Sequence, residues 1–191
     1  MLNNLEKYDV VLGSNSPRRR ELLNDMGVTF RVEAIKGIDE SYPSDLPVEE
    51  IPVYLSRVKA AGHPLQPQEL LITADTVVVL DEEVLGKPVG DADAHRMLRA
   101  LSGRAHRVIS GVCVTTVDRS ESFADTSVVH FADLTDEEID YYIKHYRPLD
   151  KAGAYGIQEW IGNIGIMGIE GDFYNVMGLP TRRLYQLLKS F

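Results

Sequence analysis

The chain has 191 residues and a mass of 21.4 kDa, with 44% hydrophobic and 26% charged residues, a composition typical of a globular protein with one sizeable core. Its 20 basic and 29 acidic residues give a net charge of −9, which argues against broad binding to nucleic acids or anionic membranes, since both favour a basic surface. An anionic small molecule would need a local island of basic side chains.

The first seven residues lack the basic and apolar regions of a signal peptide, and no segment approaches the roughly 18 apolar residues of a membrane span. We therefore expect a cytoplasmic protein. The single cysteine, Cys113, lies in the apolar run 112–114, so we expect a small buried side chain rather than a nucleophile.

The chain begins with an apolar strand at residues 8–13 and a helix at residues 17–26. Ser16 is predicted as the N-cap of this helix, Pro17 as its first residue, and Gly27 lies just past its end. This order places a strand, a short turn and a helix N-terminus in sequence, which is a common arrangement for binding phosphate.

Strand and helix patterns alternate through the rest of the chain. Thr135 and Glu138 form a capping-box pattern, Asp91 is expected to cap its helix, and residues 153–171 are expected to form a loop with a short strand. The remaining predicted strands are at 28–35, 71–80, 84–85, 104–117 and 123–131, with a turn at 81–83 between the second and the third. The remaining predicted helices are at 49–61, 91–103, 136–146 and from 180 onward. This alternation predicts an α/β fold with a mixed sheet.

Three consecutive arginines, Arg18, Arg19 and Arg20, occupy the first turn of the predicted helix. The positive end of the helix dipole disfavours them, and they also repel one another. They either point into water or hold an anion such as phosphate, and three together favour phosphate. On this view, replacing Arg18 or Arg19 with Ala should weaken substrate binding without lowering stability. The basic island would also draw on Lys59, Lys87 and Lys151.

Asp75 interrupts the apolar strand at 71–80. A carboxylate buried there is costly unless it meets a metal, a cation or a chemical task. A purely structural ion pair with Lys59 or Lys87 would also satisfy it, and the residues alone leave the two interpretations open.

Two kinds of catalytic motif are absent from the sequence. The five histidines show no zinc-ligand spacing, and the chain has no Walker-type Gly-x-x-x-x-Gly-Lys pattern, which argues against a catalytic zinc and a P-loop enzyme.

Eight segments in order carry a resemblance to a known family: SNSPRRRELL at 14–23, IDE at 38–40, KA at 59–60, ADTVV at 74–78, GKP at 86–88, SGRAHRVISGV at 102–112, DKAGAYGIQ at 150–158 and GDFYNVMGLP at 171–180. The chain resembles the Maf family of nucleotide pyrophosphatases. The resemblance implies one domain over residues 1–191, with an elongated mixed sheet flanked by helices and a cleft between two lobes (Maf/Ham1-like). Related proteins are generally dimers, so it also implies a homodimer.

The resemblance further implies hydrolysis of a nucleoside triphosphate between its α and β phosphates. Asp75 matches the family's catalytic proton acceptor, and Glu40 matches a residue that would help Asp75 hold a divalent cation, for which Mg²⁺ is physically apt. Whether base and metal ligand are one residue or two is left open. The implied substrate-binding residues are Ser16, Arg18, Arg19, Lys59, Thr76, Lys87 and Gln158. His106 lies inside a family motif and has either a structural role or a place in the site.

Arg18, Thr76 and Gln158 match the branch of the family that acts on dTTP and UTP. One departure is that Glu159 and Trp160 follow Gln158, where a small residue is common. The alternative function is a non-catalytic nucleotide-binding regulator of cell division or septum formation, which would bind nucleotides without turnover. Normal and modified pyrimidine triphosphates are both open as physiological substrates.

Overall fold

The computed structural model describes residues 2–191, which form two compact units. Unit 1 contains residues 2–76, 110–125 and 178–191, and unit 2 contains residues 77–109 and 126–177. That residues 1–191 make up a single domain stays a prediction.

The seven strands are β1 (Asp9–Leu12), β2 (Arg31–Val32), β3 (Glu69–Leu80), β4 (Glu83–Leu85), β5 (Ala105–Thr115), β6 (Ser120–Phe131) and β7 (Ile166–Glu170). Their order is β2-β1-β3-β5-β6-β7, with β4 paired to β3. Within unit 1, β1 is parallel to both β2 and β3, whereas within unit 2 β7 is antiparallel to β6 and β4 to β3. The predicted α/β class with a mixed sheet is therefore confirmed.

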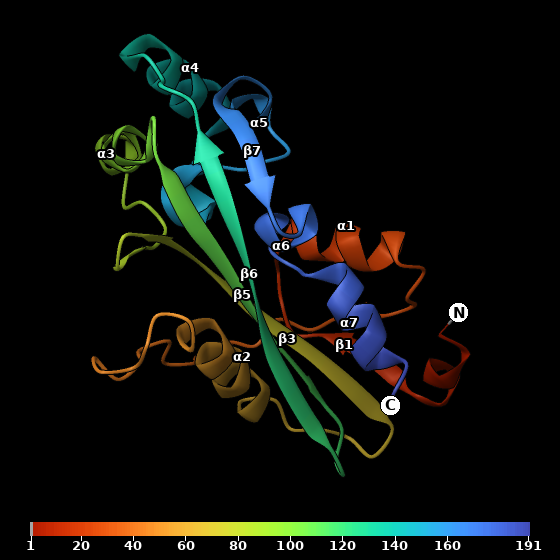
Figure 1. Cartoon of the computed structure of the whole chain (residues 1–191). Helices are drawn as coiled ribbons and strands as arrows, with labels where there is room; N and C mark the ends of the chain where they lie inside the picture. The colour runs from red at the N-terminus through yellow and green to blue at the C-terminus, as the bar shows by residue number, and fades with distance from the viewer. Residues whose placement is uncertain (1) are drawn as a thin grey trace. The chain divides into compact units, whose positions relative to one another are not determined.

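The helices of unit 1 are α1 (Pro17–Asp25), α2 (Ile51–Ala61) and α7 (Thr181–Leu188), with the 3-10 helix η1 (Asn3–Lys7). Those of unit 2 are α3 (Asp91–Leu101), α4 (Asp136–Tyr146), α5 (Trp160–Gly165) and α6 (Phe173–Met177), with the 3-10 helices η2 (Pro148–Asp150) and η3 (Ala152–Ala154). Helices α3 and α4 contact each other in unit 2 (Figure 1). In the part of the chain from residue 2 onward, no helix is long and apolar enough to cross a membrane.

The start of unit 1 follows the sequence pattern closely. Ser16 is the N-cap of α1, with its hydroxyl facing the backbone N–H of Arg19, and Gly27 adopts a φ of +70° just past the helix end. Helix α2 packs closely on β5 because Gly111 has no side chain, and a Cβ there would lie 2.1 Å from the carbonyl carbon of Pro52. A core cluster beneath these elements contains Val11, Ala60, Leu71 and Cys113, so the expected burial of the cysteine is confirmed.

In unit 2, the capping box at the start of α4 is present as predicted. The Thr135 hydroxyl accepts from Glu138 N at 3.2 Å, and the Glu138 carboxylate accepts from Thr135 N at 2.8 Å. These bonds satisfy two backbone donors at the helix start.

Three expectations about local structure were wrong. The strand expected at 28–35 is only Arg31–Val32, and both of its residues are exposed. Gly90, not Asp91, is the N-cap of α3, and Asp91 is the first helical residue. The stretch expected as loop and strand at 153–171 also contains α5, which is only six residues long and too short for a clear apolar period.

Candidate active site

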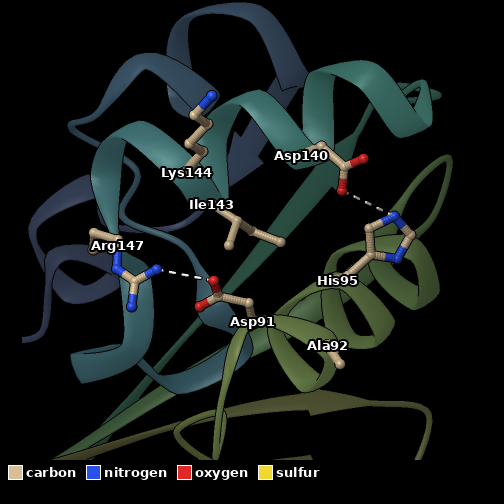
Figure 2. Close-up of a pocket in the computed structure, with 7 residues that line it drawn as sticks. All are labelled: Asp91, Ala92, His95, Asp140, Ile143, Lys144 and Arg147. Atoms are coloured by element: carbon tan, nitrogen blue, oxygen red, sulfur yellow. Dashed lines mark hydrogen bonds and ion pairs between the residues drawn. The ribbon is translucent and has the colours of Figure 1, made fainter.

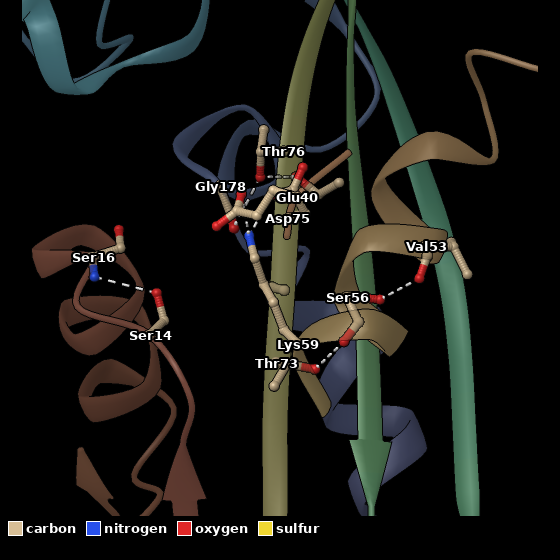
Figure 3. A network of polar contacts seen from close by, with 12 residues as sticks. Ser14, Ser16, Glu40, Val53, Ser56, Lys59, Thr73, Asp75, Thr76 and Gly178 are labelled. Atoms are coloured by element: carbon tan, nitrogen blue, oxygen red, sulfur yellow. Dashed lines mark hydrogen bonds and ion pairs between the residues drawn. The ribbon is translucent and has the colours of Figure 1, made fainter. Parts of the chain in front are cut away.

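Asp75 and Lys59 form an ion pair in unit 1. Lys59 Nζ lies 2.7 Å from Asp75 Oδ1 and 3.2 Å from Glu40 Oε2, so one ammonium contacts two carboxylates (Figure 3). The side chains of Lys59 and Asp75 are 15% and 14% exposed, so both remain accessible from solvent. Of the two partners considered for Asp75, Lys59 is the one that the structure provides.

One buried hydroxyl attaches α2, which carries Lys59, to β3, which carries Asp75, and a second buried hydroxyl bonds within α2 itself. The Thr73 hydroxyl donates to the Ser56 carbonyl at 2.7 Å, and the Ser56 hydroxyl donates to the Val53 carbonyl at 2.7 Å (Figure 3). Both side chains lie in the core of unit 1. The Thr73 bond holds the helix against the strand and so helps to fix the distance between the lysine and the carboxylate.

Arg19 is the centre of a second network in unit 1. Its Nε donates to the Gly178 carbonyl at 2.9 Å and its Nη2 to the Thr76 hydroxyl at 3.1 Å. Its Nη1 donates to the Ala74 carbonyl at 2.8 Å and to the Ser14 hydroxyl at 3.3 Å. Four of the five guanidinium N–H groups therefore bind protein oxygens.

This geometry argues against one expectation from the sequence, that removing Arg19 leaves stability unchanged. Arg19 does not simply point into water, because its hydrogen bonds connect the start of α1 to β3 and to Gly178. Its removal should therefore lower the free energy of unfolding rather than leave it unchanged. Burial lowers the pKa of the Arg19 guanidinium, while Asp75 raises it, Arg18 lowers it and Glu40 raises it. Arg19 is thus in electrostatic contact with both candidate acidic residues.

Thr76 and Gly178 complete this network. The Thr76 hydroxyl hydrogen-bonds the Ser110 hydroxyl at 2.8 Å, besides accepting from Arg19. Gly178 has a φ of +114°, a conformation that residues with a Cβ rarely adopt. Sequence reasoning missed the roles of Ser14, Ser110 and Gly178, although all three lie inside segments that carry the family resemblance.

Ser16 and Arg18 lie at the N-terminus of α1. The Ser16 N–H donates to the Ser14 hydroxyl at 3.2 Å, and the Ser16 hydroxyl accepts from Arg19 N at 3.5 Å. Arg18 is half-buried. Unit 1 therefore contains seven of the predicted site residues: Ser16, Arg18, Arg19, Glu40, Lys59, Asp75 and Thr76.

The other two predicted site residues belong to unit 2. Lys87 is exposed between β4 and α3, and Gln158 is exposed in the turn before α5. Their substrate-binding roles stay predictions.

His106 is buried in unit 2 and has a packing environment. Its Nε2 hydrogen-bonds the Tyr155 hydroxyl at 2.7 Å, and its ring stacks on Phe131 with centroids 5.4 Å apart. Burial, with a smaller contribution from His130, lowers the pKa of His106 to about 4. Of its two possible uses, these contacts favour a role in holding the fold.

The buried neutral His106 makes stability depend on pH. Its pKa is about 4 in the folded protein and about 6.5 in the unfolded chain, so the unfolded state binds more protons between these values. The contribution of the neutral His106 to the free energy of unfolding is fully present above about pH 6.5 and is lost as the pH falls toward 4. We expect a loss of about 2 kcal/mol in the free energy of unfolding between pH 7 and pH 5 from this residue.

Urea unfolding of the wild type and of a His106→Phe/Tyr155→Phe variant measures this loss. The second substitution removes the hydroxyl that His106 would otherwise leave without its partner. The fall in the free energy of unfolding from pH 7 to pH 5 should be smaller in the variant by about 2 kcal/mol. Equal drops in the two proteins would assign the pH dependence to other groups.

A different group of side chains in unit 1 has the donor atoms for a metal ion. One ligand atom each from Glu33, His63 and Glu69 lies within 4.8 Å of the others. Arg31 pairs with both of these glutamates, and His63 Nε2 lies 2.9 Å from Glu69 Oε2. This group does not include the predicted metal ligands Glu40 and Asp75.

A surface pocket of about 490 Å³ lies between α3 and α4 of unit 2 (Figure 2). Four of its lining side chains form two pairs: Arg147 Nη1 lies 2.9 Å from Asp91 Oδ2, and His95 Nε2 lies 3.6 Å from Asp140 Oδ1. None of the predicted site residues lines it.

The chain is similar to known proteins along its whole length. It is 56% identical over 192 residues to the dTTP/UTP pyrophosphatases of Phocaeicola vulgatus and Bacteroides thetaiotaomicron, with 100% of each chain covered. It is 47% identical to the dTTP/UTP pyrophosphatase of Cytophaga hutchinsonii, covering 99% of this chain and 87% of that protein.

A solved structure has the same fold. The HAM1 protein from Coxiella burnetii matches with a TM-score of 0.52 and 16% identity, over 96% of this chain and 100% of that one. The family described as Maf-like protein matches residues 9–191. With this match and relatives more than half identical over their full length, the chain belongs to the Maf family.

Proposed function

We propose that this chain is a nucleoside triphosphate pyrophosphatase that hydrolyses dTTP and UTP to the monophosphate and pyrophosphate. Its full-length relatives carry that name, which supports the substrate class. The observation that supports the chemistry is the Asp75 carboxylate, which is 14% exposed in an otherwise buried strand and lies beside Lys59.

In the proposed reaction, the oxygen of a water molecule attacks the α phosphorus and the bond from this phosphorus to the α–β bridging oxygen breaks. Asp75 accepts the proton of the water, and pyrophosphate leaves. Arg18, Lys59, Lys87 and the N-terminus of α1 at Ser16 are proposed to bind the negative charge of the triphosphate.

Arg19 has a more limited part in substrate binding. Because four of its N–H groups bind protein oxygens, one Nη2 N–H is left for a phosphate oxygen. We propose that Arg19 acts mainly by holding Ala74 and Thr76, the neighbours of Asp75, in place.

We propose that Glu40 and Asp75 hold a divalent cation, with Mg²⁺ as the apt ion. The donor set fits, because Mg²⁺ prefers oxygen ligands and both carboxylates already converge on one positive charge, the Lys59 ammonium. When bound, the ion supplies positive charge to the phosphate oxygens. Asp75 is proposed as the base whether or not it is also a metal ligand.

Thr76 and Gln158 are proposed to set the base preference. The Thr76 hydroxyl is engaged by Arg19 and Ser110, so its part is to shape the site. The exposed Gln158 amide can donate to O4 of uracil or thymine and accept from N3–H.

A pyrophosphate-release assay with Mg²⁺ and a panel of triphosphates tests the proposed function. We expect faster hydrolysis of UTP and dTTP than of ATP, GTP and 7-methyl-GTP. Nucleotide binding without turnover would favour the regulatory alternative. Faster hydrolysis of 7-methyl-GTP than of UTP would refute the pyrimidine assignment.

Replacing Gln158 with Glu should remove the base preference. A carboxylate offers no amide donor to O4, so the UTP-to-GTP ratio of kcat/KM should fall by at least about tenfold. The control is Gln186→Glu, the same change at an exposed position of α7. If both variants keep the wild-type ratio, Gln158 does not read the base.

We also propose that the protein is cytoplasmic and forms a homodimer. Size-exclusion chromatography with light scattering measures the assembly state, and a mass near the 21.4 kDa of one chain would contradict the dimer.

A further inference from the structure

The turn that carries Gln158 is a short loop of unit 2 between η3 and α5. Glu159 N donates to the Gly156 carbonyl at 3.0 Å, so the backbone reverses across Ile157 and Gln158. This single backbone bond leaves the turn dependent on side chains to hold it in place.

One buried hydroxyl of α4 contacts the residues at both ends of this turn. The Tyr142 hydroxyl accepts from the Gly156 N–H at 3.0 Å and donates to the Glu159 carboxylate. Tyr142 is fully buried. Burial first, and then the Glu159 carboxylate, raises the pKa of Tyr142, so the hydroxyl keeps its proton and remains a donor.

A buried lysine holds the other oxygen of the same carboxylate. Lys151 Nζ lies 3.1 Å from Glu159 Oε1 and 2.7 Å from Asp150 Oδ1, and Lys151 is 8% exposed. A Cβ on Gly156 would lie 3.0 Å from the Glu159 carboxyl carbon and 3.1 Å from Lys151 Cε. The turn is therefore packed directly against this ion pair, and a Cβ at position 156 would fit only if these side chains shifted.

We infer that Tyr142 and Glu159 are positioning residues that fix the Gln158 turn and so set base selectivity. The inference rests on the proposed function, because it assigns the reading of the base to Gln158. An amide that discriminates by donor and acceptor must be held in one orientation, since a mobile glutamine can rotate to match several bases.

Tyr142→Phe tests the inference, with Tyr141→Phe as the matched control. Both substitutions remove one hydroxyl from α4, but the Tyr141 side chain is 45% exposed and its ring, which packs against Trp160, is retained. Three quantities are measured: the UTP-to-GTP ratio of kcat/KM, the inhibition constant of inorganic triphosphate, and hydrogen exchange of the Gly156 amide.

We expect Tyr142→Phe, which removes both hydrogen bonds of the hydroxyl, to lower the selectivity ratio about fivefold and to speed exchange of the Gly156 amide. The inhibition constant of inorganic triphosphate, which has no base, should change by less than about twofold. Tyr141→Phe should leave all three quantities at their wild-type values. A merely structural role would alter triphosphate inhibition and selectivity together.

Selectivity that survives in Tyr142→Phe, with or without faster amide exchange, overturns the inference while leaving the proposed function intact. A wild type without preference for UTP overturns the proposed function itself, and that result is seen before any variant is made. Glu159→Gln serves if Tyr142→Phe does not fold, because it keeps an acceptor for Tyr142 but removes the charge that Lys151 holds. It should also lower the ratio, and an unchanged ratio counts against the inference.

Discussion

Replacing Asp75 with Asn is expected to lower kcat for UTP hydrolysis by about 10²–10⁴-fold while the protein remains folded. The amide has nearly the shape of the carboxylate but is too weak a base to accept the proton of the attacking water. The fold should survive because Asp75 is partly exposed and Lys59 retains Glu40 as a partner. Pyrophosphate release and urea unfolding, measured on the same preparation, check the two halves of this result.

Asp118→Asn is the matched control, since Asp118 is exposed in the turn between β5 and β6 of unit 1. It should change neither kcat nor stability. A fully active Asp75→Asn variant would exclude Asp75 as the base. A variant that unfolds would favour a structural ion pair as the main use of this residue.

A titration with Mg²⁺ separates the two proposed tasks of Asp75. If its essential task is to hold the ion, excess Mg²⁺ should restore a large part of the activity of Asp75→Asn, because weaker binding is offset by concentration. If its essential task is that of a base, the activity stays low at every Mg²⁺ concentration.

The parts of the fold predicted most closely were those with local signals. Ser16, Pro17 and Gly27 define α1 through capping chemistry, and Thr135 with Glu138 defines the start of α4 in the same way. Short elements such as α5 and β2 have too few residues for a periodic pattern, and their existence depends on packing that is not encoded locally.

The sequence identified the Asp75 position because a carboxylate in an apolar strand is visible as a violation of the pattern. It could not choose between Lys59 and Lys87 as the partner, since that depends on how α2 lies against β3. In unit 1 a bond between these two elements comes from the Thr73 hydroxyl, which donates to the Ser56 carbonyl and has no distinctive sequence signal.

For Arg19, the dipole of α1 and the hydrogen bonds seen in the structure predict opposite effects on the free energy of unfolding. Considered alone, Arg19 opposes the dipole of α1, at a cost of about 0.3–1 kcal/mol. Its hydrogen bonds go to Ala74 and Gly178, which are 55 and 159 residues away along the chain. No local pattern reveals such contacts, and together they outweigh the dipole.

Arg19→Ala is therefore expected to lower the free energy of unfolding by about 3 kcal/mol, which reverses the expectation from the sequence. The substitution removes four hydrogen bonds from a charged donor and leaves the carbonyls of Ala74 and Gly178 without that partner. Relief of the helix dipole returns at most about 1 kcal/mol. Urea unfolding measures the net change, and Arg20→Ala, an exposed position in the same helical turn, should change stability by less than about 0.5 kcal/mol.

Arg19→Lys separates the role of geometry from that of charge. Lysine keeps the positive charge, but its ammonium cannot reach the Ser14 hydroxyl, the Thr76 hydroxyl and two separate carbonyls as a planar fork does. If Arg19 acts mainly by holding the segment around Asp75, the lysine variant should lose most of the stability and most of the activity that the alanine variant loses. A lysine variant with wild-type stability and activity would show instead that only the charge of Arg19 matters, and the network around Ala74 and Gly178 would then contribute little to either.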